Sequence, residues 1–407
     1  MAELREGDHH DGSTTLKACA ESNARWLHRA IELAARGRCG ASPNPMVGAV
    51  VLDADGRVAG EGWHAMCGGP HAEVIALREA GDRARGGTLY VSLEPCSHHG
   101  RTPPCADAIV AAGISRVVVA ARDPNPDAAG GVERLRAEGI EVCEGPGGTA
   151  ARTLNRRWLV WAEERRPWVT AKIAMSLDGH TATRTGESMW ITGEAARRRG
   201  LELREEHDAI LVGVNTVLAD DPRLTRRLGT NPGPPLRRII LDARLRTPAD
   251  AVVVRTDPET TLVVTTSAAD PDRRCALSSA GVEILEVPAN ATGRVDLDAL
   301  LDALGRRRVA ALLVEGGATV HGDFADCGLI DELFVFVAPL VIGGPGRPAI
   351  GGAGIGVLAD VTPYRFQEVA RHGEDLELHA LRADRIEAAD EPDEDGSEAP
   401  ERQCSRA

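Results

Sequence analysis

Residues 94–105 read EPCSHHGRTPPC and contain two Pro-Cys pairs, which place Cys96 and Cys105 nine positions apart. Upstream, residues 70–77 read PHAEVIAL and contribute His71. A catalytic zinc ion commonly takes three protein ligands from His and Cys and keeps its fourth position for water. We therefore predict a zinc site formed by His71, Cys96 and Cys105.

Glu73 lies two residues after His71, at the start of a predicted helix over residues 73–80. Its carboxylate can therefore lie beside the fourth position, where it would take a proton from the water and pass it on. The deaminase signature H-x-E followed by P-C-x-x-C is matched as far as Cys96, whereas the second cysteine comes six residues late. A zinc-stapled binding module or two buried thiols would have no use for Glu73, which favours a catalytic site.

The residues between the two cysteines form a predicted loop over the site. Two prolines at 103–104 favour a helix start, so Cys105 falls in the first turn, where the helix dipole favours a thiolate. His98, His99 and Arg101 then lie on the loop. A loop with Arg and His beside a hydrolytic metal indicates an anionic substrate such as a phosphate. We interpret His98 as a loop or substrate contact, because three metal ligands are already present.

Length and composition predict two α/β domains in a cytoplasmic protein. The chain of 407 residues has room for two cores, and nine cysteines without an even framework indicate a reducing compartment. Neither a secretory signal nor a spanning apolar run is present, so we expect no membrane partner. Residues 1–22 and 384–407, predicted to be disordered, carry −3 and −6 of the net charge of −14. The body is close to neutral, which argues against nucleic acid as a partner.

Hydrophobic patterns place a first domain at residues 23–166 and a second at 167–383. The alternation of strands and helices predicts, in both domains, a sheet covered by helices. The first domain has a helix opening at residue 23, strands at 47–52, 88–93 and 116–121, helices at 73–80 and 104–112, and a helical linker at 150–165. The second has strands at 168–174, 209–213, 238–241, 261–265, 282–287, 309–314 and 332–338, and a helix at 318–327.

Lys172 is the only lysine between residues 23 and 383, in a chain with 45 arginines. It lies in the predicted strand 168–174, where a lysine among apolar neighbours is costly unless it lines a cleft. We interpret it as a group chosen for its compact ammonium; the alternative is drift at a tolerant position. After the strand 309–314, glycines 316–317 lead into a helix N-terminus, a weak candidate for a phosphate site without a G-x-G-x-x-G motif.

Four segments of the first domain resemble the deaminase half of the bacterial bifunctional riboflavin-biosynthesis deaminase/reductase family. They are SPNPMVGAVV (42–51), GWHAMCGGPHAE (62–73), LEPCSHHGRTPPC (93–105) and DPNP (123–126). The long insert between the cysteines distinguishes this family from cytidine and transfer-RNA deaminases. The resemblance implies as substrate a 2,5-diamino-6-(ribosylamino)pyrimidinone 5′-phosphate that loses its ring 2-amino group as ammonia.

By the same resemblance Asn44 and His64 would contact this substrate, and Arg101 its phosphate. Between two prolines, Asn44 is a rigidly presented amide suited to a pyrimidine edge, although a simple turn residue is the alternative.

The segments MSLDG (175–179), GESMWIT (186–192) and VNTVLADDPRLTRR (214–227) resemble the reductase half of the same family, which has a dihydrofolate-reductase-like fold. The resemblance implies NADPH as hydride donor and reduction of the ribosyl group to ribityl. It implies substrate contacts by Lys172, Ser188, Arg204, Leu224, Arg227 and Glu315. It implies cofactor contacts by Ala174, Trp190, Thr216, Asp220, Gly317, Ala318, Thr319, Val320, His321, Gly322 and Asp323.

The sequence thus predicts an N-terminal cytidine-deaminase-like α/β/α domain followed by a dihydrofolate-reductase-like α/β domain. The predicted function is zinc-dependent deamination of a pyrimidine ribosyl phosphate and then NADPH-dependent reduction. The alternative is a zinc deaminase of another nucleotide or of a nucleic-acid base, with an inactive reductase domain. The sequence leaves open whether the chain forms a homo-oligomer.

Overall fold

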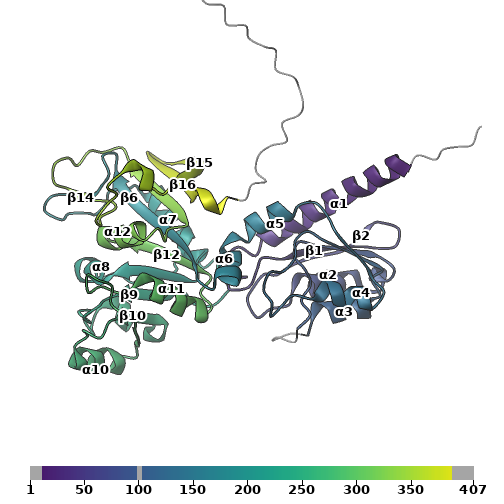
Figure 1. Ribbon diagram of the computed structural model, residues 1–407, viewed down its shortest axis with the longest axis horizontal. Coiled ribbons are helices and arrows are strands. Elements are labelled where there is room, and N and C mark those ends of the chain that lie inside the picture. The colour runs from purple at the N-terminus through teal and green to yellow at the C-terminus, as the bar shows by residue number, and fades with distance from the viewer. Residues whose placement is uncertain (1–11, 99–102, 387–407) are drawn as a thin grey trace, which may run out of the picture.

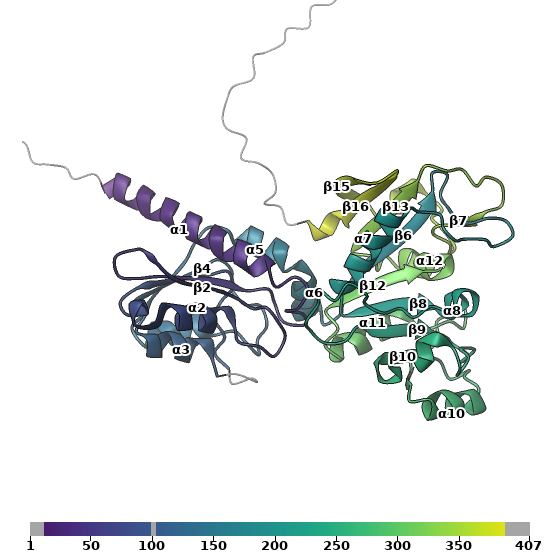
Figure 2. The same cartoon turned by 180° about the vertical axis from the view of Figure 1, so that it is seen from behind.

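The computed structural model describes residues 12–98 and 103–386, with side chains described from residue 20 onward. Within these limits the chain forms two bodies, each built on its own sheet (Figure 1). The opposite view shows the same division, with helix α6 (Arg156–Glu164) between the bodies (Figure 2). Most of the predicted acidic tail, residues 387–407, lies outside the described residues.

The first helix, α1 (Gly12–Ala35), is longer than the sequence pattern indicates. A start at residue 23 and a disordered segment over residues 1–22 were the expectation, and for residues 12–22 that expectation is wrong. Its C-terminal part buries Leu27, Ala30 and Leu33 completely. The preceding residues offer little apolar surface, so burial gives no signal there, but a helix already nucleated can extend at low cost.

The first sheet has the order β2-β1-β3-β4-β5, and β1 runs antiparallel to both of its neighbours while β3, β4 and β5 are parallel. Its strands are β1 (Gly48–Leu52), β2 (Val58–Trp63), β3 (Thr88–Val91), β4 (Arg116–Val119) and β5 (Glu141–Glu144). One face packs against α2 (Ala72–Ala80), α3 (Cys105–Ala112) and α4 (Gly131–Ala137). The other face packs against α1, α5 (Gly148–Leu154) and α6. The sheet is therefore covered on both faces, as predicted.

The linker predicted as one helix over 150–165 is broken into α5 and α6 at Asn155. The Asn155 side chain accepts from the Met46 backbone N–H at 2.7 Å and donates to the Met46 carbonyl at 2.9 Å. These bonds tie the linker to the first body at the break. From α6 the indole of Trp161 donates to the Gly305 carbonyl of the second body at 2.9 Å.

The second sheet has the order β11-β10-β9-β8-β12-β6-β13-β16-β15. It is parallel from β11 to β13, and β16 and β15 add an antiparallel edge. The strands are β6 (Trp168–Ser176), β8 (Ala209–Gly213), β9 (Arg237–Leu241), β10 (Thr261–Thr265), β11 (Glu283–Glu286), β12 (Ala311–Gly316), β13 (Glu332–Ala338), β15 (Tyr364–His372) and β16 (Asp375–Arg382). The seven predicted strands are confirmed, whereas the edge pair was not predicted.

Helices cover both faces of this sheet. Leucines of α11 and Phe324 of α12 pack on one face, and valines of α8 and α9 pack on the other. The helices are α7 (Glu194–Glu205), α8 (Val214–Asp220), α9 (Val252–Arg255), α10 (Pro271–Ser279), α11 (Leu297–Arg306) and α12 (Ala318–Asp326). A short ribbon pairs β7 (His180–Ala182) with β14 (Arg347–Pro348). Among the described helices, none is long and apolar enough to cross a membrane.

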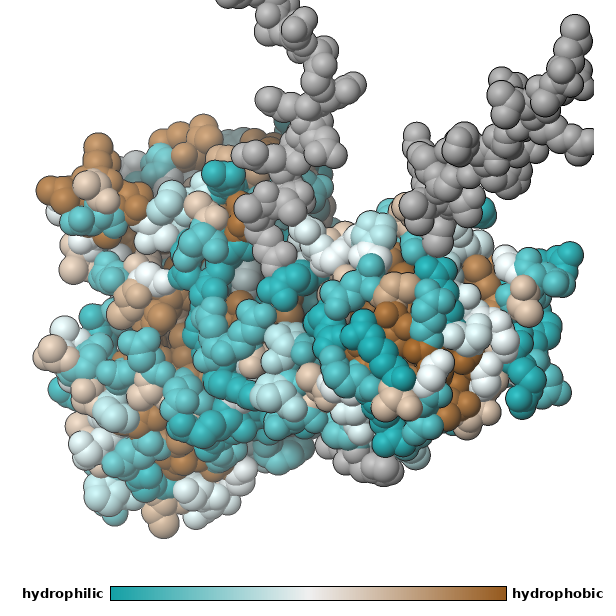
Figure 3. Space-filling view, turned by 45° about the vertical axis from the view of Figure 1, so that its right-hand side comes forward, coloured by the Kyte–Doolittle hydropathy of each residue, from teal (hydrophilic) through white to brown (hydrophobic). Residues whose placement is uncertain are grey.

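The seam between the two bodies holds both polar and apolar contacts. Hydrophilic residues gather over it in the space-filling view (Figure 3), and ion pairs cross it, such as Arg157 of α6 with Glu332 of β13 at 3.0 Å. Apolar contacts cross it as well: Ala310 packs with the core that contains α6, and Val160 of α6 packs with Trp168 of β6.

Candidate active sites

His71, Cys96 and Cys105 come together although two helices and a strand separate them in the chain. His71 caps α2 with extended backbone, and Cys105 is the first residue of α3, as predicted. His71 Nδ1 lies 3.1 Å from Cys105 Sγ and 3.6 Å from Cys96 Sγ. One ligand atom from each of the three lies within 4.8 Å of the others. Donor types, spacing and burial all fit a zinc ion with one further position open.

Glu73 stands in the first turn of α2, two residues after His71. Its side chain is only 3% exposed, and burial raises the pKa of its carboxyl. Glu73 lines the same pocket as His71 and Cys96, so its carboxylate faces the space in which the open position of a bound metal would lie. This is the arrangement that a general acid/base beside a metal requires.

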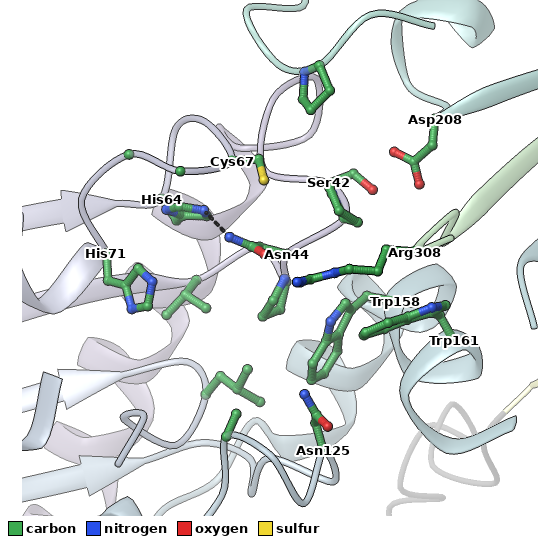
Figure 4. A pocket seen from close by; sticks show the side chains of 18 of the residues that line it. Ser42, Asn44, His64, Cys67, His71, Asn125, Trp158, Trp161, Asp208 and Arg308 are labelled. Atoms are coloured by element: carbon green, nitrogen blue, oxygen red, sulfur yellow. Dashed lines mark hydrogen bonds between the residues drawn. The ribbon is translucent and has the colours of Figure 1, made fainter. Parts of the chain in front are cut away.

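Asn44 and His64 form a hydrogen-bonded pair at the centre of the pocket (Figure 4). His64 Nδ1 lies 3.0 Å from the Pro70 carbonyl, so this nitrogen is the donor and Nε2 is left to accept. The Asn44 amide nitrogen lies 3.1 Å from that Nε2 and donates to it. Burial lowers the pKa of His64, in keeping with a neutral ring. The amide oxygen of Asn44 is thereby oriented and left available to a ligand.

His98 lines this pocket as well, whereas Arg101 lies outside the described residues. The pocket has a volume of 420 Å³ and is lined by both bodies of the chain. Residues of the second body in its wall include Asp208 and Arg308 (Figure 4). Sequence reasoning missed this shared wall, because no local pattern links positions so far apart.

Glu94 belongs to the segment EPCSHHGRTPPC, but the sequence alone indicated no role for it. It is buried, and its carboxylate accepts from the backbone N–H groups of Gly130 and Val132 at 3.0 and 3.1 Å. It also accepts from the Asp123 N–H at 3.2 Å. Glu94 thus holds the segment 123–126, whose Asn125 lines the pocket. Its position directly before Pro95-Cys96 was the available signal.

The second predicted site centres on Lys172 in β6. Burial lowers the pKa of Lys172, and the nearby Glu315 carboxylate opposes that shift. Glu315 of β12 receives two hydrogen bonds from Arg204 of α7, at 2.7 and 2.8 Å. Burial would raise the pKa of Glu315, but Arg204 and Lys172 outweigh it and lower the pKa to about 2. Three predicted substrate contacts therefore form one charged cluster.

The predicted cofactor contacts lie at the carboxyl ends of neighbouring parallel strands. Thr216 is in the first turn of α8 after β8, and residues 317–323 begin α12 after β12. A Cβ at Gly317 would lie 3.6 Å from Thr216 Oγ1, so the two helix N-termini adjoin. Open α/β sheets bind ligands at this edge. Ala174 and Asp220 complete the set, at the end of β6 and of α8.

The remaining predicted contacts lie on connecting segments. Ser188 and Trp190 precede α7, and Leu224 and Arg227 follow α8. Trp190 is 69% exposed and carries the Arg197 guanidinium over its ring at 4.6 Å, so it is not a core tryptophan. Within the described residues, no hydrogen bond, ion pair or ring contact joins these four residues to Lys172.

Fold and sites together define a two-domain enzyme, with a His-Cys-Cys cluster that fits a metal of the hydrolytic type in one domain and the charged cluster of Lys172, Glu315 and Arg204 in the other. Comparison with known proteins agrees. A family described as the cytidine and deoxycytidylate deaminase zinc-binding region matches residues 20–121. A family described as the RibD C-terminal domain matches residues 167–378.

Whole-chain relatives show the same domain order. The riboflavin biosynthesis protein RibD of Bacillus amyloliquefaciens is 42% identical over 361 residues, which cover 88% of this chain and 96% of the relative. RibD of Escherichia coli is 41% identical, with 88% and 99% covered. A solved structure of Acinetobacter baumannii RibD superposes with a TM-score of 0.81 at 39% identity, with 89% of this chain and 99% of that chain covered.

A Thermotoga maritima protein described as a diaminohydroxyphosphoribosylaminopyrimidine deaminase/5-amino-6-(5-phosphoribosylamino)uracil reductase has a TM-score of 0.75 at 34% identity, covering 89% of this chain and 99% of its own. The chain belongs to the RibD family, and it is a deaminase and reductase of riboflavin biosynthesis. The predicted fold pair and the predicted function are confirmed, and the alternative of an unrelated deaminase is not favoured.

Proposed function

We propose that residues 23–166 deaminate 2,5-diamino-6-(5-phosphoribosylamino)pyrimidin-4(3H)-one, and that residues 167–383 then reduce the product to 5-amino-6-(5-phosphoribitylamino)uracil. The observation that carries the first half is the convergence of His71, Cys96 and Cys105 beside the pocket that Glu73 lines. The name of the Thermotoga relative supports these substrates.

In the deaminase site, a zinc ion held by His71, Cys96 and Cys105 would supply an activated water. Glu73 removes a proton from the attacking water and delivers it to the departing 2-amino group, so that ammonia leaves and a ring carbonyl forms. Asn44 presents its amide oxygen to the polar edge of the ring, while His64 fixes its orientation. The Pro70 carbonyl in turn holds His64.

In the reductase site, NADPH would supply the hydride that reduces C1′ of the ring-opened ribosyl group. Lys172 would present a compact ammonium to the substrate, and the nearby Glu315 carboxylate favours the charged form of that ammonium. Glu315 accepts hydrogen bonds from Nε and Nη2 of Arg204. Nη1 donates to the Thr225 carbonyl at 3.4 Å and has a second N–H group for a phosphate oxygen. Arg227 would be the second phosphate contact, with Ser188 and Leu224 around the substrate.

The cofactor would lie along the strand edge formed by Thr216 and the start of α12, with its phosphates at a helix N-terminus. Both reactions take a small-molecule substrate. We place them in the cytoplasm, because the seven cysteines whose side chains the structure describes are all free. Neither nucleic acid nor membrane is part of this proposal.

The test is an ammonia-release assay with the diamino pyrimidine phosphate, run with and without NADPH. Zinc-loaded enzyme should release one ammonia per substrate without NADPH, and NADPH absorbance should then fall by one equivalent when the cofactor is added. Release of ammonia without NADPH oxidation would overturn the reductase half of the proposal. No release from this substrate, but release from another base, would overturn the deaminase half.

A further inference from the structure

The pocket that holds the deaminase site is closed by the reductase domain of the same chain. Its wall includes four reductase-domain arginines, at positions 226, 237, 307 and 308. The deaminase substrate proposed above carries a phosphate, which requires a cation at some point of this pocket. The question is which guanidinium is free to bind it.

Two of the four arginines are already committed to other groups. Arg226 donates to the carbonyls of Arg204, Pro234 and His207 at 3.1, 2.6 and 2.6 Å. Arg307 donates to Glu283 at 3.1 Å. A third, Arg237, lies at the limit of ion-pair distance, 4.0 Å from the same carboxylate.

Arg308 differs from these three. In the parts of the chain that the structure describes, its guanidinium pairs with no carboxylate and lies over the ring of Trp161, 5.6 Å from the ring centre. Stacking on an aromatic face leaves the in-plane N–H groups of a guanidinium open to an anion. In Figure 4 Arg308 reaches into the pocket, with Asn44 between it and His71.

The backbone holds Arg308 in this place. It has a φ of 60°, uncommon for a residue with a side chain, at the turn that ends α11. Its N–H donates to the Gly305 carbonyl at 2.9 Å, and Trp161 donates to the same carbonyl. Two residues on, Ala310 donates to the Asp208 carboxylate at 2.8 Å. The turn is therefore fixed from both sides.

Asp208 also faces the deaminase domain: burial raises the pKa of its carboxyl, and the nearby Ser42 side chain opposes that shift. Ser42 is two residues before Asn44, so one carboxylate lies beside both the Arg308 turn and the loop that presents the Asn44 amide (Figure 4). The pocket thus has His71 at one end, Asn44 in the middle and, at the other, the Arg308 guanidinium, which has no carboxylate partner among the described residues (Figure 4).

We propose that Arg308, a reductase-domain residue, binds the 5′-phosphate of the deaminase substrate, with Asp208 positioning it. A phosphate oxygen would accept from the guanidinium while the pyrimidine ring lies between Asn44 and the metal site. The inference rests on the proposed function.

The test measures steady-state ammonia release by full-length Arg308→Ala. We expect KM for the diamino pyrimidine phosphate to rise about 10- to 100-fold, the loss typical of a charge-assisted contact, with a smaller change in kcat. Zinc content and NADPH oxidation with the deaminated intermediate should stay at wild-type values. Arg308→Lys, which keeps the charge, should recover part of the loss.

The matched control is Arg306→Ala, which removes an exposed arginine of the same turn region that pairs with Asp302 and does not line the pocket. The dephosphorylated substrate gives the decisive comparison. It should raise KM strongly for wild type but hardly further for Arg308→Ala, because the lost contact is the same. An unchanged KM in Arg308→Ala, or equal and additive losses, would overturn the inference. The proposed function fails separately, if wild type releases no ammonia from the phosphorylated substrate.

Discussion

At the scale of single residues, the proposed deaminase site assigns metal binding and proton transfer to different side chains. His71, Cys96 and Cys105 offer donor atoms for the proposed zinc ion, and Glu73 is buried beside them without being needed as a fourth ligand. Burying a carboxylate costs desolvation free energy, so a buried carboxylate beside a pocket indicates a role in the reaction. The two roles can therefore be tested apart.

Replacing Glu73 by Gln should leave one zinc per chain and abolish most deamination. The amide keeps the shape and burial of the side chain but cannot accept the proton, so we expect kcat to fall about 100- to 10,000-fold. Zinc by elemental analysis and ammonia release are the two measurements. In Cys105→Ala, by contrast, zinc itself should be lost. Near-normal ammonia release from Glu73→Gln would show that another group is the base.

In the reductase domain, substitution of Lys172 tests one activity while the other serves as the control. A Cβ placed at Gly200 would lie 3.4 Å from Lys172 Cε, so there is little room for a longer, planar guanidinium. Lys172→Arg should therefore fail to oxidise NADPH almost as completely as Lys172→Met, while ammonia release is untouched. If Lys172→Arg oxidises NADPH at the wild-type rate, the reductase reaction does not require a lysine at this position. Loss of both activities would mean that Lys172 supports the fold.

At the scale of elements, the metal site depends on how closely α2 approaches the first sheet. A Cβ at Gly62 of β2 would lie 2.3 Å from the Ala72 carbonyl and 2.7 Å from the Ala76 N–H, both of them backbone of α2. Glycine is thus required for α2 to lie flat on β2. His71, at the N-terminus of this helix, would move with any displacement of it.

Gly62→Ala should therefore reduce zinc content and ammonia release together, while NADPH oxidation with the deaminated intermediate persists. Backbone cannot move aside cheaply, so we also expect the deaminase domain to lose about 2 kcal/mol of stability. The control is Gly356→Ala, where the added Cβ would meet nothing within 4 Å. Full zinc occupancy in Gly62→Ala would contradict this account of how the helix is placed.

The elements also show what the sequence could predict. Buried parallel strands such as β10 read as largely apolar runs, and the two prolines before Cys105 placed the start of α3 correctly. The edge strand β15 was missed because its residues are mostly exposed, which removes the apolar signal. The break at Asn155 was missed because its cause is a tertiary bond to Met46. The shared pocket wall at Arg308 was missed for the same reason, because it depends on contact between segments that are distant in the chain.

At the scale of the whole molecule, α6 fastens the two domains through one buried carboxylate. Glu332 of β13 accepts from Arg157 of α6 at 3.0 Å. The same carboxylate accepts from Trp168, Thr170 and His379 at 3.0, 2.7 and 2.9 Å. Burial would raise the pKa of Glu332, but Arg157 outweighs it together with these donors and holds the pKa well below its usual value. A carboxyl group of this kind stabilises the fold above its unfolded pKa, near 4.5, and that contribution is lost as pH falls towards the folded pKa.

Arg157→Met should therefore destabilise the protein by about 2 kcal/mol at pH 7, because it leaves a buried charge without its cation while keeping the apolar stem. The Glu332 pKa rises in the variant, so the difference from wild type should shrink as pH falls below about 4. Urea unfolding at both pH values, followed by a separate probe in each domain, measures it. Arg134→Met, which breaks the exposed pair with Asp107, is the control and should cost less than about 1 kcal/mol at either pH. A difference between Arg157→Met and wild type that does not change with pH would mean that Arg157 acts through packing of α6 and not through the charge of Glu332.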